Sequence, residues 1–529
     1  MRTFCLLLIA AGSLAFAGVA RAVDGPPGVA VYYSPPTSGI YVGSPGIVVL
    51  SDGTYLIKCD QFGPNAQEHK TAVTRVLQSK DGGATWSPLA KIDGLFWANI
   101  IEHRGAVYMI GTSTEYGMLV CLKSADGGKT WTTPTDDKTG LLRTGKWHTA
   151  PVPMVEHDGR LWRAVEDAEG PPGWGLMFRP RMMSIPVDAD LLDAGQWTIT
   201  PPIERDNAWL GGTFKVVLEG NAVFDRQTNS VVNVLRTNYA ERAAVARVTD
   251  GGRTLVPDPD FVVDGLGGTT KKFVIRWDEQ SKQYFALANI VAPADVTMKE
   301  SGDVRNTLAL LASPDLRKWT LNTVLLHHAD ATKHAFQYPD WLIDGDDLIL
   351  ASRTGYDSPA GLPPRGHDAN YLTFHRFKNF RDLTPKDGPQ LPQAKTVTRD
   401  FGGLRVRGVA CEFARLDNGV RAFTNRNYVW QNVPAELKGA TITQGSGDFR
   451  GVITVEATDG PQTLRVFTAG PAEGVDLSGF TTVPSVRFNY NDGARSAAVV
   501  YERELKAGES VKLPTGNFAG VHVIVPAKN

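Results

Sequence analysis

The sequence is poor in cysteine, is almost neutral in net charge, and lacks long apolar segments beyond its first 22 residues. The 529 residues include four cysteines, and the formal net charge is −1. A membrane span needs about 20 consecutive apolar residues, and no stretch after the N-terminus comes close. Because basic and acidic runs are also missing, we expect neither nucleic acid nor an anionic membrane as a partner.

The small number and the spacing of the cysteines argue against a disulfide framework and against a zinc site. Cys5 lies in the N-terminal apolar segment, so that Cys59, Cys121 and Cys411 remain beyond it. Such an odd and sparse set predicts no disulfide framework, and no C-x-x-C pair indicates a zinc site.

The first 22 residues are typical of an export signal. Arg2 precedes the apolar stretch "CLLLIAAGSLAFAGVA", and the small-residue motif Ala-Arg-Ala ends at Ala22. We therefore predict a signal peptide over 1–22 that is cleaved after about Ala22, and a secreted or periplasmic mature protein.

Helical periodicity of any length is missing, and a repeated turn motif is present instead. The chain contains "SKDGGATW" at 79–86 and "SADGGKTW" at 124–131, with weaker copies at 248–255 and 313–319. Asp followed by two glycines favours a tight turn, because glycine tolerates positive φ and the Asp side chain bonds turn N–H groups. We expect a structural role for these octets, with Asp81 and Asp126 facing their own turns.

A second repeat consists of strand–turn–strand segments. Six of them occur, at 46–57, 98–111, 150–164, 221–236, 272–288 and 340–353. A period of about 50 to 70 residues with several strands each predicts a propeller of four-stranded blades. The Pro-rich stretch 383–392 ends this pattern, and short alternating strands follow it. We predict an all-β chain with a six-bladed β-propeller over 23–388 and a β-sandwich over 389–529.

The geometry of a hairpin indicates where a ligand would bind. The first strand begins and the second strand ends at the same edge, so the open ends of all six hairpins line one face of the propeller. Carboxylates, arginines, a tyrosine and tryptophans gather there, as expected of a polar sugar site. They include Asp60, Trp97, Trp147, His148, Glu219, Arg236, Arg305, Tyr338 and Arg353, with Glu68 and His69 in the loop 61–70.

The octets resemble the Asp boxes of the bacterial sialidase (neuraminidase) superfamily, also called BNR repeats. The resemblance covers roughly 30–385 and implies a six-bladed propeller. It further implies three arginines that bind a substrate carboxylate, a tyrosine nucleophile activated by a glutamate, and an acidic general acid/base.

Three segments carry the family's residues in the same order. The segment "LEGNAVFDRQTNSVVNVLR" resembles the one that holds the activating glutamate and an arginine, which points to Glu219 and Arg236. "VRNTLALLASPDLRKW" resembles the segment with the next arginine, Arg305, and "FQYPDWLIDGDDLIL" resembles the nucleophile segment, with Tyr338. Tyr338 and Glu219 are therefore the predicted catalytic pair.

The chain departs from the family at two places. Where the family has Arg-Ile-Pro, this sequence has "VGSPGIVVL", with Gly43 at the place of the arginine. The loop that holds the family's acid/base offers Glu68 and His69 and no aspartate, so both compete for this role.

The remaining predicted residues belong to substrate binding. Arg236 and Arg305 would bind a carboxylate, and Trp97 and Trp147 would stack on a sugar ring. Asp60, His148 and Arg353 would add polar contacts to the same substrate.

A metal site is not expected from the histidines. His327, His328 and His334 are close in sequence but have no acidic or cysteine partner at ligand spacing. We therefore predict no metal ion and no cofactor.

Three functions remain open from the sequence. The first is an exported exo-glycosidase that removes a terminal acidic sugar from a glycan with retention of configuration. The second is a hydrolase or lyase on a uronic-acid polysaccharide that uses His69 or His148 as acid/base. The third is a glycan-binding propeller without catalysis, and in every case the partner is a glycan.

Overall fold

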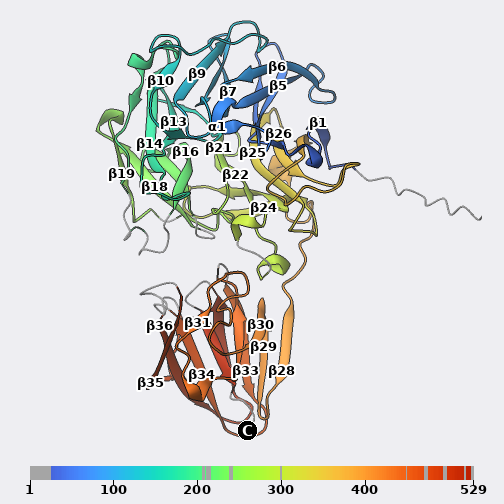
Figure 1. Ribbon diagram of the computed structural model, residues 1–529, viewed down its shortest axis with the longest axis vertical. Coiled ribbons are helices and arrows are strands. Elements are labelled where there is room, and N and C mark those ends of the chain that lie inside the picture. Colours follow the sequence, from blue (N-terminus) through green and yellow to red (C-terminus); the bar gives the residue numbers. More distant parts are fainter. Residues whose placement is uncertain are drawn as a thin grey trace, which may run out of the picture.

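The structure is a computed structural model that describes residues 25–525, except for 205–208, 210–215, 238–241, 262, 298–300, 448–449, 470–474, 492–496 and 517–519. The predicted signal peptide lies outside the described residues. The all-β prediction is confirmed, because nearly all regular elements are antiparallel strands (Figure 1). None of the described helices is long and apolar enough to cross a membrane.

Six sheets of four or five strands follow one another along the first part of the chain. The first sheet contains β2 (Tyr41–Val42), β3 (Gly46–Val49), β4 (Tyr55–Phe62), β5 (Val73–Ser79) and β6 (Ser87–Asp93). The second contains β7 (Phe96–His103), β8 (Ala106–Thr112), β9 (Leu119–Ser124) and β10 (Leu141–Arg143). The third contains β11 (Trp147–His148), β12 (Val155–His157), β13 (Arg160–Asp167), β14 (Arg179–Pro186) and β15 (Thr198–Ile199).

The other three sheets continue the pattern. The fourth contains β16 (Val217–Asp225), β17 (Ser230–Thr237), β18 (Arg242–Thr249), β19 (Thr254–Pro257) and β20 (Val263–Asp264). The fifth contains β21 (Val274–Asp278), β22 (Gln283–Asn289), β23 (Thr307–Ser313) and β24 (Thr320–His327). The sixth contains β25 (Ala335–Asp344), β26 (Asp347–Gly355), β27 (Tyr371–Phe377) and β1 (Val29–Tyr33).

The sheets form a ring. The strand β16 contacts β12, β13 and β21, the strand β21 contacts β25, and β25 contacts β3, which in turn contacts β7. The N-terminal strand β1 pairs with β27 and so joins the two ends of the propeller in one sheet. Closure of this kind leaves few free strand edges within the ring.

Helices are few and short. The α-helix α1 (Glu68–Thr71) lies between β4 and β5. The 3-10 helices are η1 (Pro36–Ser38), η2 (Ala194–Gln196), η4 (Asp250–Gly252), η5 (Pro293–Asp295), η6 (Ser301–Asp303), η7 (Phe380–Asp382) and η8 (Ala435–Leu437).

Two further sheets face each other in the C-terminal part, in orange and red in Figure 1. One contains β28 (Thr396–Asp400), β29 (Leu404–Val409), β33 (Arg450–Ala457) and β37 (Ser510–Gly516). The other contains β30 (Cys411–Arg415), β31 (Trp430–Gln431), β32 (Thr441–Gly445), β34 (Gln462–Ala469), β35 (Thr481–Tyr490), β36 (Ala497–Leu505) and β38 (Val521–Val525). Val406 and Val455 of the first sheet pack with Leu464 and Val466 of the second in one apolar core.

The repeated octets form the turns that the sequence predicted. The carboxylate of Asp81 accepts a hydrogen bond from the Thr85 N–H at 2.9 Å, and that of Asp126 accepts one from the Thr130 N–H at 2.9 Å. The prediction that both carboxylates face their own turns is therefore confirmed.

Three of the inner strands carry a residue with positive φ at equivalent places. Trp97 in β7, Glu219 in β16 and Tyr338 in β25 have φ values of 51°, 47° and 51°. Pairing with the neighbouring strand shifts register at each of them, which marks a β-bulge. Positive φ is uncommon for residues other than glycine, and bulges often lie beside active sites, where they change the direction of a side chain.

At two of the bulges, the side chain two residues further on accepts a hydrogen bond from the backbone of a neighbouring blade. The Asn221 Oδ1 atom accepts a hydrogen bond from the N–H of Ile275 at 3.0 Å, and the Asp340 Oδ2 atom accepts one from the N–H of Ile47 at 3.0 Å. Because these bonds are buried, they hold the bulged strands in a fixed relation to the next blade.

Candidate active site

The centre of the site is one carboxylate that contacts a phenol and a guanidinium. The Tyr338 hydroxyl donates to Glu219 Oε1 at 3.2 Å, and Arg236 Nη1 donates to Glu219 Oε2 at 2.6 Å. Burial would raise the pKa of Glu219, but the charge of Arg236 and the hydrogen bond that it donates act against burial, and this pKa lies below its usual value. Glu219 is therefore ionised and placed to accept the phenol proton.

Two more arginines lie against the Tyr338 ring. The guanidinium carbons of Arg305 and Arg353 are 5.5 Å and 5.0 Å from the ring centroid, and the two residues are 6% and 4% exposed. Within the described part of the chain neither arginine forms an ion pair, and the buried Arg353 Nε atom has no hydrogen-bond partner. Burial lowers the pKa of Arg353 to about 10 and also lowers that of Arg305.

The two guanidiniums have only neutral hydrogen-bond acceptors among the described residues: Arg305 donates to Gln337 Oε1 at 2.9 Å, and Arg353 donates to the carbonyl oxygen of His367. A buried cation without a counter-charge is costly, so such groups are normally paired. The arrangement fits an anionic ligand group, because guanidinium binds carboxylate in a planar two-point contact.

The packed rings of Trp97, His148 and Phe178 lie beside the Tyr338 phenol. Trp97 and His148 have ring centroids 4.4 Å apart, and His148 stacks on Phe178 at 4.2 Å. The His148 Nδ1 atom lies 2.7 Å from Glu166 Oε1, and this same oxygen accepts the N–H of Glu219 at 2.9 Å. Glu166 therefore positions both His148 and the backbone of the central carboxylate.

Asp60 and Trp147 are not brought into this group. Both side-chain oxygens of Asp60, which is fully buried, are occupied by Lys58, Thr74 and the N–H of Trp97. Asp60 thus supports Trp97 in the way that Glu166 supports Glu219. Trp147 packs in an apolar core, and its indole donates to a backbone carbonyl of the loop before β11.

The acid/base candidates lie in and beside helix α1. The Glu68 Oε1 atom accepts the N–H of Gly63 at 3.0 Å, and the residue is 9% exposed. His69 is 67% exposed, and its Nδ1 atom lies 3.2 Å from Glu115 Oε2. Glu115 was missed by the sequence analysis, although it lies three residues beyond the open end of β8, where the hairpin rule already pointed.

The histidines that follow β24 have acidic neighbours, so the sequence argument about them is wrong. His334 bonds Asp330 through Nδ1 at 3.0 Å and Asp357 through Nε2 at 3.1 Å. The ring of His328 stacks on that of His334 at 3.5 Å, and its Nδ1 atom accepts the Asp330 N–H at 3.0 Å. His328, His334 and Asp357 each offer one possible ligand atom within 4.8 Å of the others, and both ring nitrogens of His334 are bonded by carboxylates.

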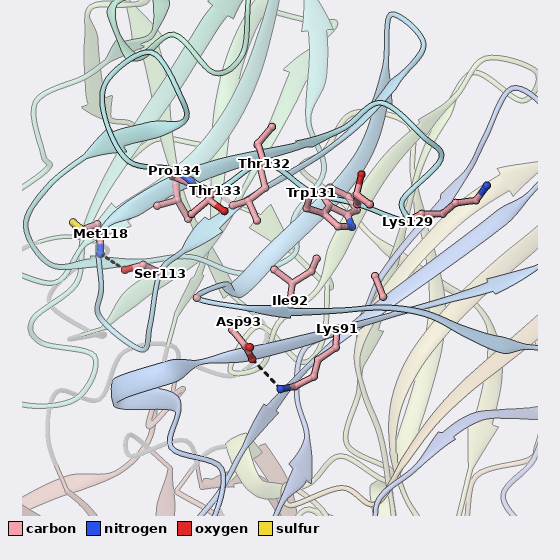
Figure 2. Close-up of a pocket in the computed structure, with 15 residues that line it drawn as sticks. Lys91, Ile92, Asp93, Ser113, Met118, Lys129, Trp131, Thr132, Thr133 and Pro134 are labelled. Carbon is pink, nitrogen blue, oxygen red and sulfur yellow. Dashed lines mark hydrogen bonds and ion pairs between the residues drawn. The ribbon is translucent and has the colours of Figure 1, made fainter.

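A surface pocket lies on the outside of the loop that carries Glu115. It is lined by β6, by Ser113 and Met118, and by the segment 129–134, which begins within the second octet (Figure 2). Lys91 and Asp93 form an ion pair at its edge. None of the residues predicted from the sequence lines this pocket.

Comparisons with known proteins gave similarities among solved structures. No family model and no curated protein matches the chain. A protein of unknown function from Dyadobacter fermentans has 13% identity and a TM-score of 0.43, with 66% of this chain and 97% of that chain covered.

Two glycosidases are also among the similar structures. An α-L-arabinofuranosidase from Fusarium graminearum has 13% identity and a TM-score of 0.42, with 68% of this chain and 99% of that chain covered. A Trypanosoma rangeli sialidase in complex with sialic acid has 14% identity and a TM-score of 0.43, with 96% and 93% covered.

Proposed function

We propose that the protein is an exo-glycosidase that hydrolyses the bond to a terminal acidic sugar with retention of configuration. The observation that supports this most is the contact of Tyr338 with the Glu219–Arg236 ion pair, beside two buried arginines that have no ion-pair partner among the described residues. The group offers a nucleophile, its base and a carboxylate-binding surface within one cluster.

Tyr338 attacks the anomeric carbon in this mechanism. A phenol has an ordinary pKa of about 10, so it needs a base to become nucleophilic at neutral pH. Glu219 takes the phenol proton while the new bond forms and the bond to the leaving oxygen breaks. Where the sugar carries its own carboxylate, a neutral phenol avoids the repulsion that a carboxylate nucleophile would meet. Water then attacks the glycosyl–tyrosine intermediate and restores the phenol.

The arginines bind the sugar's carboxylate. Arg305 and Arg353 lie against the ring of Tyr338, and Arg236 donates to Glu219 and also interacts with Tyr338. Arg353 of the sixth sheet supplies the third guanidinium that Gly43 of the first sheet does not. A side chain at Gly43 has no room, because a Cβ atom there would lie 2.8 Å from the Asp60 carbonyl oxygen.

A glycan digest tests this function. The protein is incubated with a library of glycans that end in sialic, uronic or neutral sugars, and released monosaccharides are identified by mass spectrometry. We expect release of acidic sugars only, with retained anomeric configuration by proton NMR of the first product. Release of neutral sugars alone, or inversion, would contradict the proposal.

A lyase is the second candidate, and the Glu166–His148 pair supports it. A carboxylate on Nδ1 orients an imidazole as a base, and the arginines would neutralise a uronate carboxylate during proton abstraction from the neighbouring carbon. Release of an unsaturated, ultraviolet-absorbing product from a uronate polymer, with no saturated product of hydrolysis, would favour this reaction.

The proposal also includes export of the protein and its division into two domains. The segment 1–22 is proposed to be removed after about Ala22, so that the enzyme acts outside the cytoplasm on an extracellular glycan. The propeller over 23–388 is proposed as the catalytic domain, and the sandwich over 389–529 as an accessory domain.

A further inference from the structure

Two carboxylates from neighbouring blades meet at the rim of the site. Glu68 belongs to helix α1 after β4, and Glu115 belongs to the loop between β8 and β9. The N–H of Glu115 donates to the carbonyl oxygen of Glu68 at 2.9 Å, so the two loops are joined through their backbones. One side-chain ligand atom from each of Glu68, His69 and Glu115 lies within 4.8 Å of the others.

Two carboxyl groups at this separation do not both ionise easily, because the second negative charge meets the first in a poorly solvated place. The Glu68 Oε1 atom is held in place by the N–H of Gly63, which donates to it at 3.0 Å. The side chain of Glu115 is only 19% exposed. Burial raises the pKa of Glu115, His69 opposes this, and Glu68 adds to it. Glu115 therefore binds a proton more readily than an exposed glutamate does.

Tyr116, which follows Glu115 in the chain, lies beside the aromatic rings of the site. The ring of Tyr116 lies 5.6 Å from that of Trp97 and 6.3 Å from that of His148. Tyr116 interacts electrostatically with both Glu115 and Tyr338. The titratable groups that face Glu115 are Glu68, His69, Tyr116 and His148, from three different blades.

We propose that Glu68 and Glu115 share one proton and that Glu115 is the general acid/base of the glycosidase, with Glu68 and His69 as its positioning residues. This inference rests on the proposed glycosidase function. It assigns the acid to a residue of the second blade, whereas the sequence pointed to Glu68 or His69 in the first.

The proton transfers balance over the two steps. In the first step the Glu115 O–H gives its proton to the glycosidic oxygen, which takes the electron pair of the breaking bond as Tyr338 bonds the anomeric carbon. The phenol proton passes to Glu219. In the second step the Glu115 carboxylate takes a proton from water, the water oxygen bonds the anomeric carbon, and Tyr338 leaves and recovers its proton from Glu219.

Leaving-group dependence tests the assignment. The substrates are a 4-nitrophenyl glycoside of the released acidic sugar and a natural disaccharide with the same sugar at its end. The nitrophenolate leaves without a proton, and the alcohol of the disaccharide needs one. For Glu115→Gln we expect kcat/KM for the disaccharide to fall by about 100-fold to 10,000-fold. The loss for the nitrophenyl glycoside should be at least ten times smaller.

A second variant distinguishes the role of Glu68 from that of Glu115. Glu68→Gln removes the charge beside Glu115, so the basic limb of the pH–rate profile should move to lower pH while the enzyme keeps the proton donor. Glu279→Gln is the matched control, because Glu279 lies in an exposed ion pair with Lys282 at the turn of another hairpin. Neither the leaving-group ratio nor the pH profile should change in the control.

The outcomes distinguish this inference from the proposed function. If the wild-type protein cleaves both substrates and Glu115→Gln loses activity on both equally, Glu115 is not the acid. If Glu68→Gln shows the leaving-group signature and Glu115→Gln does not, the roles are reversed and the assignment falls. If the wild-type protein cleaves neither substrate nor any acidic glycan, the glycosidase itself is wrong and the assignment falls with it.

Discussion

The Tyr338 hydroxyl and the Glu219 carboxylate are in hydrogen-bond contact at 3.2 Å although 119 residues separate them in the chain. Both residues sit at β-bulges with positive φ. A residue in this region costs about 1 to 3 kcal/mol unless its surroundings compensate. Here the Glu219 N–H is bound by Glu166, and Lys272 Nζ donates to the carbonyl of Pro339 at 2.7 Å. The strained backbones are thus fixed where the two side chains meet.

Removal of the Tyr338 hydroxyl should abolish turnover and leave the fold intact. In Tyr338→Phe the ring keeps its packing against Arg305 and Arg353, but no nucleophile remains for the anomeric carbon. We expect kcat to fall by at least about 1,000-fold, in keeping with loss of a covalent catalyst. Steady-state kinetics and thermal unfolding measure the two effects, and Tyr108→Phe in β8 is the control. A Tyr338→Phe enzyme with wild-type kcat would exclude tyrosine as the nucleophile.

Replacement of Arg353 should weaken substrate binding without loss of stability. Arg353→Met keeps much of the volume but removes a buried cation that has no ion-pair partner within the described part of the chain. A charge-assisted contact contributes about 1.5 to 3 kcal/mol, so KM for an acidic sugar should rise by about 10-fold to 150-fold.

The melting temperature of Arg353→Met should stay the same or increase, because a buried charge without an ion-pair partner among the described residues is removed. Calorimetry of the variant and the wild type measures this. A large drop in melting temperature with unchanged KM would show that Arg353 is structural.

Loss of Glu166 should impair catalysis through residues that touch the substrate. Glu166→Ala leaves His148 Nδ1 and the Glu219 N–H without their common acceptor. We expect the free energy of unfolding to fall by about 1 to 3 kcal/mol, the cost of unpaired buried groups. The kcat value should fall with little change in KM, since no substrate contact is removed.

Urea unfolding and steady-state kinetics test the Glu166 prediction. Glu102→Ala serves as the comparison, because Glu102 bonds Ser51 near the turn of the first hairpin. Equal losses of kcat in the two variants would argue against a positioning role for Glu166.

The sequence predicted the fold and the central residues because both follow from a repeat. Each hairpin places its open end on the same face, so Glu219 and Tyr338 could be expected there without knowledge of the distance between them. The rule did not distinguish Trp97 from Trp147, since both lie near the start of a first strand. Only the register shift at Trp97 separates them, and a register shift depends on pairing with β8.

The sequence analysis missed the contacts that Glu115 and Asp357 make with histidines. Glu115 meets His69 across 46 residues, and Asp357 meets His334 across 23. Glu115 and His69 lie in loops of neighbouring blades, whereas His334 and Asp357 flank the open end of the single hairpin formed by β25 and β26. Asp60 shows the reverse case, because it stands at a predicted site position but is enclosed by Lys58 and Thr74. Neighbouring strands determine whether Asp60 is buried, and the local sequence around it shows no pattern that would predict this burial.

The acid limb of the pH–rate profile should depend on Arg236. Burial favours protonation of Glu219, and Arg236 is the strongest influence that holds its pKa below the usual value. In Arg236→Gln this charge is lost while Glu219 stays buried, so the pKa of Glu219 should rise. Because Glu219 must be ionised to accept the phenol proton, activity should disappear at a higher pH than in the wild type as the pH falls.

The basic limb should stay in place in Arg236→Gln, since it belongs to a different proton donor. A profile of kcat/KM between acidic and alkaline pH, measured on the natural disaccharide, whose leaving alcohol needs a proton, separates the two limbs. Arg247→Gln is the control, because Arg247 pairs with Asp258 away from Tyr338. If the acid limb of Arg236→Gln coincides with that of the control, Glu219 does not act as the base in its ionised form, and another acceptor must take the phenol proton.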